Sequence, residues 1–177
     1  MATKKSMVLI ESKTASDDAT ISLGGANWID SYDVYIVQFS NVHCVTDAQE
    51  INFRFLDTSN NPITTSTYDS SFTELKSDAA FGDGYGDNVA TAFLTSGGLG
   101  NDTNEQLNGT VHIFQSNNTA EYTFYTTETS YLNGSGVLRG NRGGGVITTA
   151  AGTKGIQIYA ASGNLTSGNF ELYGLKK

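Results

Sequence analysis

Asp33-Val-Tyr-Ile-Val-Gln-Phe-Ser-Asn-Val42 is the stretch that decides the fold class. Its residues are mostly β-branched or aromatic, which favours an extended strand. Apolar side chains occur on both parities instead of alternating with polar ones, and this pattern is typical of a strand that is covered on both faces. The stretch therefore predicts a central strand in the middle of a β-sandwich.

Strand signals recur along most of the chain and are separated by turns rich in Gly and Asn. The segment Val111–Gln115 and the segment Glu121–Tyr125 flank Ser116-Asn-Asn-Thr119, which predicts a hairpin. Short strands at this spacing indicate an antiparallel sheet structure. The other expected strands are Ser6–Ser12, Thr20–Leu23, Glu50–Asp57, Val89–Leu94, Gly109–Ser116, Ala120–Thr127, Gly145–Thr149, Gly155–Ala161 and Asn169–Leu175.

We therefore expect an all-β fold, an antiparallel β-sandwich or jelly roll with at most one short helix. Only Ser70–Phe81 has a helical pattern, with Phe72, Leu75 and Ala79 on one side. Phe81–Asn88 and Ser96–Glu105 are expected to be long polar loops, and Gly140–Gly145 a flexible turn. Strands do not alternate with helices, which argues against a parallel nucleotide-binding sheet.

The length of 177 residues fits one domain, which we expect to span residues 1–177. Hydrophobic residues make up 38% of the chain, too many for a disordered protein. No run approaches the ~18 apolar residues of a membrane span, so a membrane is not an expected partner. The single cysteine, Cys44, excludes an internal disulfide.

The formal net charge is −8, and half of the ten basic residues lie near the two ends of the chain. These are Lys4, Lys5, Lys13, Lys176 and Lys177. The acidic body would repel phosphate backbones, so nucleic acid is not an expected partner. Residues 1–5 and 176–177 are expected to be flexible or docking tails, and the five lysines would form a basic foot if both ends leave the molecule on one side.

Catalytic chemistry has little support in the sequence. Nucleophilic catalysis needs a base beside the nucleophile, and His43 and His112 are the only histidines. His43 precedes Cys44 directly, but neighbours in a strand point to opposite faces, so they make a poor thiol–imidazole pair. We expect no catalytic residues, and a small buried side chain is the favoured interpretation of Cys44.

Calcium is the small ligand that the sequence accommodates best, because hard cations prefer several oxygen ligands. Asp83, Asp87 and Asn88 supply such oxygens in one Gly-rich segment, and Asp102, Asn104 and Glu105 supply them in another. Neither segment follows the usual calcium-loop spacing. Gly, Asp and Asn are also the ordinary residues of turns, so the expectation is that no cofactor or metal is bound.

Two stretches resemble virion structural proteins of tailed bacteriophages. The first comprises Leu9–Leu23 followed by Trp28–Val42, and the second is Gly155–Gly174, which contains Phe170-Glu-Leu-Tyr-Gly174. In that group a terminal strand of this composition closes a small β-sandwich. The resemblance implies a virion location, with major capsid, tail or neck proteins as partners.

These observations favour a non-enzymatic structural component on the exterior of a phage particle, which acts through protein–protein contacts. Head decoration and a tail, neck or fibre subunit remain open, and a homo-oligomer is expected from the symmetry of such particles. The alternative is a carbohydrate-binding or receptor-binding adhesin. The residues expected to contact a ligand or partner are Tyr85, Asp102, Glu105 and Trp28.

Overall fold

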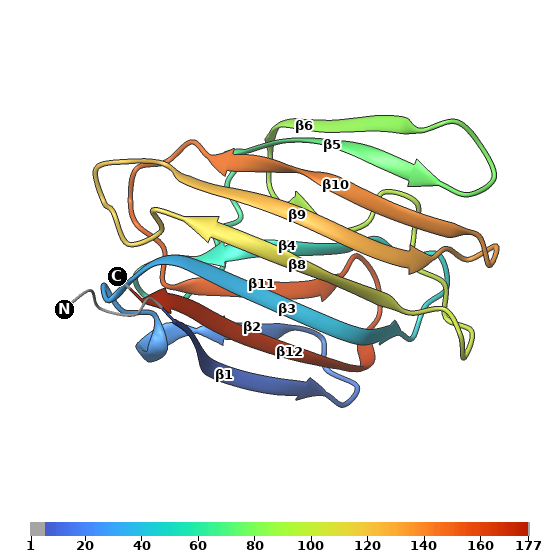
Figure 1. Ribbon diagram of the computed structural model, residues 1–177, viewed down its shortest axis with the longest axis horizontal. Coiled ribbons are helices and arrows are strands. Elements are labelled where there is room, and N and C mark those ends of the chain that lie inside the picture. The colour runs from blue at the N-terminus through green and yellow to red at the C-terminus, as the bar shows by residue number, and fades with distance from the viewer. Residues whose placement is uncertain (1–5, 177) are drawn as a thin grey trace.

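The computed structural model describes residues 6–176, which form two antiparallel β-sheets packed against each other (Figure 1). The larger sheet has the strand order β1-β12-β3-β8-β9-β10-β5-β6, and the smaller has the order β2-β11-β4-β7. The prediction of an antiparallel β-sandwich is confirmed. Within the described residues the helical content is one short 3₁₀ turn, η1 (Gly25–Asn27).

The large sheet consists of β1 (Met7–Ala15), β3 (Tyr32–Cys44), β5 (Tyr68–Lys76), β6 (Gly82–Val89), β8 (Leu107–Phe114), β9 (Thr123–Leu132), β10 (Leu138–Ile147) and β12 (Leu165–Lys176). The small sheet consists of β2 (Ile21–Gly24), β4 (Ile51–Leu56), β7 (Ala92–Phe93) and β11 (Gly155–Ala160). The predicted hairpin is confirmed, because β8 pairs with β9 and Phe114 lies opposite Phe124.

The core fills the space between the sheets and is rich in aromatic rings. Phe53 on β4 is fully buried, and its ring centroid lies 5.6 Å from that of Phe55 and 5.1 Å from that of Tyr125 on β9. Tyr68 is also fully buried, and its hydroxyl accepts a hydrogen bond of 2.9 Å from the backbone N–H of Phe55. Rings of the two sheets therefore pack against one another between the layers, and their burial stabilises the fold.

One open side of the sandwich is closed by a charged pair on the edge strand β1. The Glu11 carboxylate accepts a hydrogen bond of 2.8 Å from the Gly24 N–H of β2, and the Lys13 Nζ donates one of 2.6 Å to the Ser22 carbonyl. The two side chains also form an ion pair of 3.2 Å. They satisfy backbone groups at the edge of β2, and inward-pointing charges of this kind protect sheet edges from pairing with other chains.

Three expectations about local structure are wrong, and they share one cause. Residues 70–81 were expected to be helical, and residues 81–88 and 140–145 to be loop or turn, yet they contribute to β5, β6 and β10. The Phe72 ring lies across Gly84 of β6, where a Cβ atom would stand 2.3 Å from the Phe72 Cζ. Glycines therefore make room for this ring within the sheet, a contact between non-neighbouring segments that local propensity does not report.

The expectation that residues 33–42 are covered on both faces is also wrong. Strand β3 lies between β12 and β8, and its buried residues alternate with half-buried or exposed ones. Tyr35, Val37 and Phe39 point into the core, whereas Val34 and Ile36 point away from the small sheet. The second apolar parity of this strand therefore belongs to an outer surface that the described residues do not cover.

Candidate interaction surface

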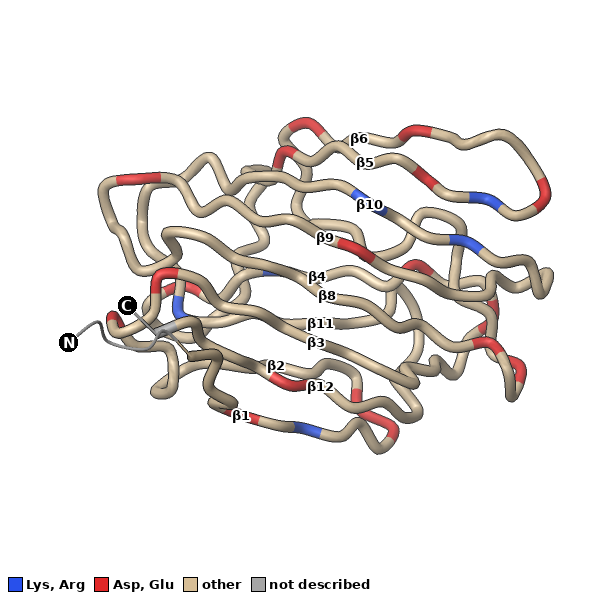
Figure 2. The backbone as a smooth tube through the Cα atoms, viewed as in Figure 1, with Lys and Arg blue, Asp and Glu red and all other residues tan. Residues whose placement is uncertain are grey.

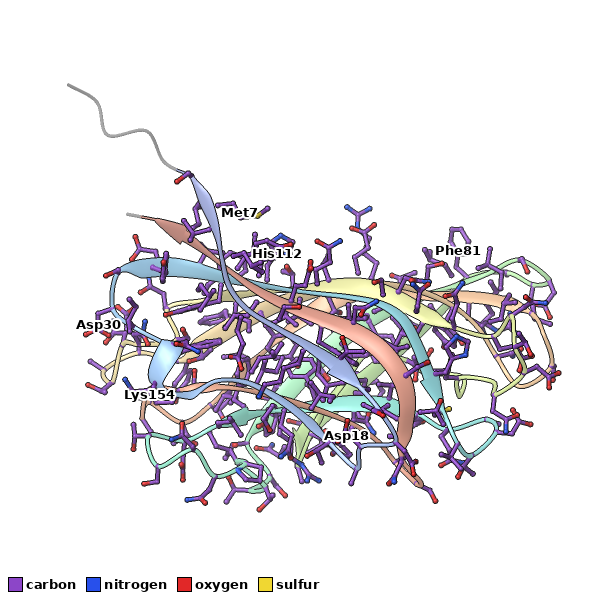
Figure 3. All side chains as sticks on the ribbon, turned by 90° about the horizontal axis from the view of Figure 1, so that it is seen from below. Met7, Asp18, Asp30, Phe81, His112 and Lys154 are labelled. Atoms are coloured by element: carbon purple, nitrogen blue, oxygen red, sulfur yellow. The ribbon has the colours of Figure 1, made fainter. Side chains whose placement is uncertain are left out.

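The outer face of the large sheet is built by the alternation of side chains along its strands. On β9, the residues Thr123, Tyr125 and Thr127 are buried, whereas Phe124 between them is 53% exposed. Met7 on β1 is 56% exposed, and Figure 3 shows Met7 and His112 projecting from this same face. The antiparallel register then decides which outward side chains stand next to each other.

An apolar row crosses the outer face at the end where the two described chain ends lie. Its members are directly paired from strand to strand, on β1, β12, β3, β8, β9 and β10 in turn. Six strands at the usual spacing place the first and last members about 24 Å apart. The apolar row consists of Met7, Leu175, Val34, Phe114, Phe124 and Val146.

The character of the outer face changes along the strands. Two residues further in, a second row is mixed and contains Leu9, Tyr173, Ile36, His112, Thr126 and Gly144. The next row, which we call the polar row, contains Ser12, Glu171, Gln38, Thr110, Glu128 and Arg142. The apolar row is thus continuous across six strands at this end of the sheet, and contiguous patches of this kind mark interaction sites. A separate group of exposed apolar side chains, Leu75, Phe81 and Leu138, lines a hollow at the other end.

None of the six members of the apolar row is charged, and charged residues border the row. Strand β8 carries no Lys, Arg, Asp or Glu, and Figure 2 shows most acidic residues in loops and on other strands. On β5, Asp69 lies directly opposite Val146, the last member of the row. Asp87 lies next to Asp69 on β6, between Gly86, which pairs with Ser70, and Val89, which pairs with Tyr68. The β10 end of the row is therefore bordered by carboxylates.

Tyr85 stands at this acidic border and is 79% exposed. It lies opposite Ser71, and with Asp69, Asp87 and Gly144 it lines a shallow hollow of about 450 Å³. The prediction that Tyr85 is available to a ligand or partner agrees with this placement. The sequence interpretation assigned it to a loop, whereas the structure places it on the edge strand β6.

Trp28 does not belong to this surface. It is 1% exposed, its ring stacks on that of Tyr35 at 3.8 Å, and its Nε1 donates a hydrogen bond of 3.1 Å to the Ser116 Oγ. Burial raises the pKa of Tyr35, whose hydroxyl donates to the Ile29 carbonyl at 2.6 Å. The expectation that Trp28 contacts a ligand is therefore wrong: the ring is a core residue, and it cannot stack on a sugar from solvent.

Asp102 and Glu105 are hydrogen-bonded to each other. The Glu105 carboxylate accepts a hydrogen bond of 2.9 Å from the Asp102 N–H, and the Glu105 N–H donates one of 2.8 Å to the Asp102 carbonyl. Glu105 is only 7% exposed, whereas Asp102 is exposed. The pair closes a turn in the predicted loop of residues 96–105, so the Glu105 side chain is not presented to a ligand.

The calcium candidates are not brought together. Asp83 and Asp87 lie on one face of β6, four residues or about 13 Å apart along the strand. The Asp87 carboxylate accepts a hydrogen bond of 2.8 Å from the Asn88 side chain, and the Asn88 N–H donates to the Asp69 carboxylate at 2.8 Å. Among residues 6–176, no three His, Cys, Asp or Glu side chains form a group suited to a metal ion.

The five lysines of the expected basic foot are only partly placed. Met7 pairs with Leu175, so the first and last described strands end side by side (Figure 1). Lys4, Lys5 and Lys177 lie outside the described residues, and Lys176 is the last residue of β12 and not part of a free tail. Lys13 is separated from that end by six residues of β1, or about 20 Å, and its ion pair with Glu11 excludes it from the foot.

His43 and Cys44 point to opposite sides of β3, as the sequence interpretation predicts. His43 is half-buried, whereas Cys44 is 3% exposed and donates to the Thr46 carbonyl at 3.1 Å. Burial, and secondarily the charge of Asp47, raises the pKa of the Cys44 thiol to about 11. This environment is that of a core cysteine and is the opposite of what activates a thiolate.

The residues of the apolar row were missed as a site by sequence reasoning. Val34 and Phe124 were recognised only as members of strands, because a run with apolar residues on both parities has two explanations. Either both faces of the strand are covered within the chain, or one face is covered only when a partner binds. The signal was therefore present in residues 33–42, but it could not distinguish a core from an interface.

Comparison with known proteins finds no matching family model, no matching characterised protein and no matching solved structure. Within residues 6–176, no helix has the length and apolar character needed to cross a membrane.

Proposed function

We propose that this chain is a non-enzymatic structural component on the exterior of a tailed-phage virion, and that it binds its neighbours through the outer face of its large sheet. The observation that carries the proposal is the apolar row, since Met7 and Phe124 are each more than half exposed within it. Exposed apolar side chains in register across six strands provide area for protein–protein contact.

The phage setting derives from the resemblance of the two terminal stretches. Residues 9–23 and 28–42 contribute to β1, β2 and β3, and residues 155–174 contribute to β11 and β12. In the large sheet these strands are neighbours, in the order β1-β12-β3. The resembling stretches therefore meet in one region of the molecule, next to half of the apolar row, and this supports a shared structural role for them.

The test is incorporation into particles. In a phage that encodes this chain, the Phe124→Asp variant is expected to be lost from purified virions, as measured by quantitative mass spectrometry. Phe81→Asp is the matched control, because Phe81 is 70% exposed and projects from the same side of the molecule far from the row (Figure 3). Wild-type incorporation of Phe124→Asp would contradict the proposal.

The copy number in the same preparation separates the two placements on the particle. Hundreds of copies per virion would assign the chain to head decoration, with the major capsid protein as its neighbour. A few copies to a few dozen would assign it to the tail, neck or fibre.

Sugar binding is the second candidate function, and the exposed Tyr85 beside the hollow favours it. An aromatic face stacks on the apolar face of a sugar ring, and carboxylates such as Asp69 and Asp87 accept hydrogen bonds from its hydroxyl groups. On a glycan array, binding by the wild-type chain that is lost in Tyr85→Ala would support this function. Absence of wild-type binding across the array would remove it.

A further inference from the structure

We propose that the free edge of β6 binds an extended segment of another protein, which joins the large sheet as an added strand. The segment that fits this edge carries Lys or Arg at every second position and apolar side chains between them. The inference goes beyond the proposed function, because the edge of β6 is a different surface from the apolar row.

Strand β6 is the last strand of the large sheet, and only one of its edges is paired (Figure 1). Its eight residues pair with β5 on one side, regularly from Gly82 to Gly86, and residues 6–176 provide no backbone partner on the other side. Alternate residues of a strand direct their N–H and C=O groups to opposite edges. The free edge therefore presents donors and acceptors that a further strand can use.

The other edge strands in the described part of the chain are bridged, interrupted or short. Glu11 and Lys13 of β1 bond to the backbone of β2 at Gly24 and Ser22, so side chains connect these two edges. A register shift also interrupts β1 between Leu9 and Glu11. At the end of the small sheet, β7 has only two residues. Strand β6 is therefore the edge best suited to accept another chain.

Carboxylates line the outer face of β6. Asp83 and Asp87 flank Tyr85 on this face. Asp69 of β5 lies beside them, since its carboxylate accepts a hydrogen bond from the Asn88 N–H. Strand β6 contains no Lys or Arg, and the charges that Figure 2 marks along it are acidic. An added strand places its outward side chains directly beside these carboxylates, where basic side chains form favourable cross-strand pairs.

The same charges disfavour a second copy of β6 as the added strand. In an antiparallel pair centred on Tyr85, Asp83 of each copy would lie opposite Asp87 of the other. A parallel pair in register would place each aspartate beside its own counterpart. Like charges directly opposite one another destabilise a strand pair. A basic segment of a different protein is therefore the favoured occupant.

The other face of β6 is bare, because glycines occupy it at positions 82, 84 and 86. The half-buried Phe72 ring lies across Gly84, where a Cβ atom would stand 2.3 Å from the Cζ at the far end of the ring. The Phe93 ring reaches Gly86, where a Cβ atom would stand 3.0 Å from its Cε2. No side chain at these positions separates the two rings from the free edge. Apolar side chains of an added strand would therefore pack against the rings.

These features match recognition by strand addition, in which backbone hydrogen bonds supply affinity and alternate side chains supply specificity. The segment expected at β6 directs its basic side chains toward Asp83 and Asp87 on the outer face. Its apolar side chains point to the opposite face, toward Phe72 and Phe93.

A synthetic peptide in which Lys and Val alternate tests the free edge. Fluorescence anisotropy of the labelled peptide should show saturable binding to the full chain at concentrations below about 1 mM. The same peptide with every backbone nitrogen methylated keeps its charge but cannot pair as a strand, so it should bind at least about tenfold more weakly. Absence of binding by the Lys–Val peptide, or equal binding of the methylated peptide, would overturn the inference.

Variants of the chain test the charge pairing. Asp83→Asn and Asp87→Asn are each expected to weaken peptide binding by about twofold to fivefold, as is usual for exposed charge pairs. Glu50→Gln is the matched control, because Glu50 is an exposed carboxylate that precedes β4 of the small sheet. It should bind the peptide as the wild type does, and circular dichroism verifies the fold of all three variants. Equal losses in the three variants would show attraction to net charge alone and would overturn the inference.

Hydrogen exchange locates the bound peptide. Amides of residues 82–89 should exchange several-fold more slowly when the peptide is bound, whereas those of β1 and β2 should not change. Binding that protects other strands and leaves β6 unchanged would overturn the inference. Phe124→Asp should bind the peptide normally, because Phe124 lies on β9. Loss of that variant from virions and failure of peptide binding are therefore independent results, so the two proposals fail separately.

Discussion

The two faces of the large sheet are made by the same strands and are both partly apolar, yet only one of them is covered. Phe39 and Phe124 illustrate the difference: Phe39 is 2% exposed against the small sheet, and Phe124 is 53% exposed on the opposite face. Burial against a second layer stabilises the monomer, whereas an uncovered apolar side chain stabilises it little. The comparison separates residues that hold the fold from residues that are available for contact.

The largest expected effect comes from the inner side of the sandwich. Phe53→Ala should lower the free energy of unfolding by about 3–5 kcal/mol, because it removes a fully buried ring and leaves a cavity between two aromatic neighbours. Phe124→Ala should lower it by less than about 1 kcal/mol, since much of this side chain already contacts water. Urea denaturation measures both values, and equal losses would contradict the division between the two faces.

Gly84→Ala is expected to have the next largest effect, about 1–3 kcal/mol. The added Cβ would stand 2.3 Å from the Phe72 Cζ, so the ring has to move out of its present position. Gly136→Ala is not a suitable control, because Gly136 has a positive φ of 68°. Gly82→Ala is suitable, since its Cβ would meet only the ends of flexible side chains. Thermal denaturation should rank Gly84→Ala well below Gly82→Ala, and the reverse order would contradict the packing of Phe72.

Glu11→Ala should cost about 1–2 kcal/mol, because the half-buried Gly24 N–H loses its acceptor and Lys13 loses its ion pair. The outer-face residue Ser12, its neighbour on β1, provides the comparison: Ser12→Ala should leave the unfolding midpoint within the error of the measurement. If both substitutions are neutral, then the charged pair does not close the side of the sandwich.

The smallest effect is expected at Cys44, whose thiol should react very slowly in the folded chain. With a pKa of about 11, only about one thiol in a thousand is ionised at pH 8, and the side chain is 3% exposed. Iodoacetamide should therefore leave the native chain unmodified at pH 8 and should alkylate it fully in denaturant, as measured by mass spectrometry. Rapid alkylation of the native chain would show that this side of β3 is open.

Much of the fold could be predicted because strand signals are local. The run Asp33–Val42 and the hairpin around residues 116–119 carry their β-branched, aromatic and turn residues in adjacent positions. The β5–β6 hairpin could not be predicted, because Phe72 is stabilised by glycines of two other strands, Gly84 and Gly143. The Gly and Asp residues of β6 are typical of a loop, and the sequence alone does not show that the Phe72 ring packs on this segment.

The candidate site was harder to predict than the fold. Tyr85 was identified from its Gly-rich surroundings, but Trp28 was assigned to the same surface and is buried beneath Ser116 and Tyr35. The apolar row depends on register across strands that are far apart in the sequence, such as Leu175 beside Val34. Single-strand periodicity contains no information on such neighbours, so only the assembled sheet reveals them.

Hydroxyl-radical footprinting of the chain within purified virions tests the central claim most directly. Met7 and Phe124 on the apolar row are expected to be labelled several-fold less in the virion than in the free chain. Phe81, which is 70% exposed outside the row, should be labelled equally in both. Equal labelling of Met7 and Phe124 in the two states, with protection of Phe81 or of the small sheet instead, would contradict the account.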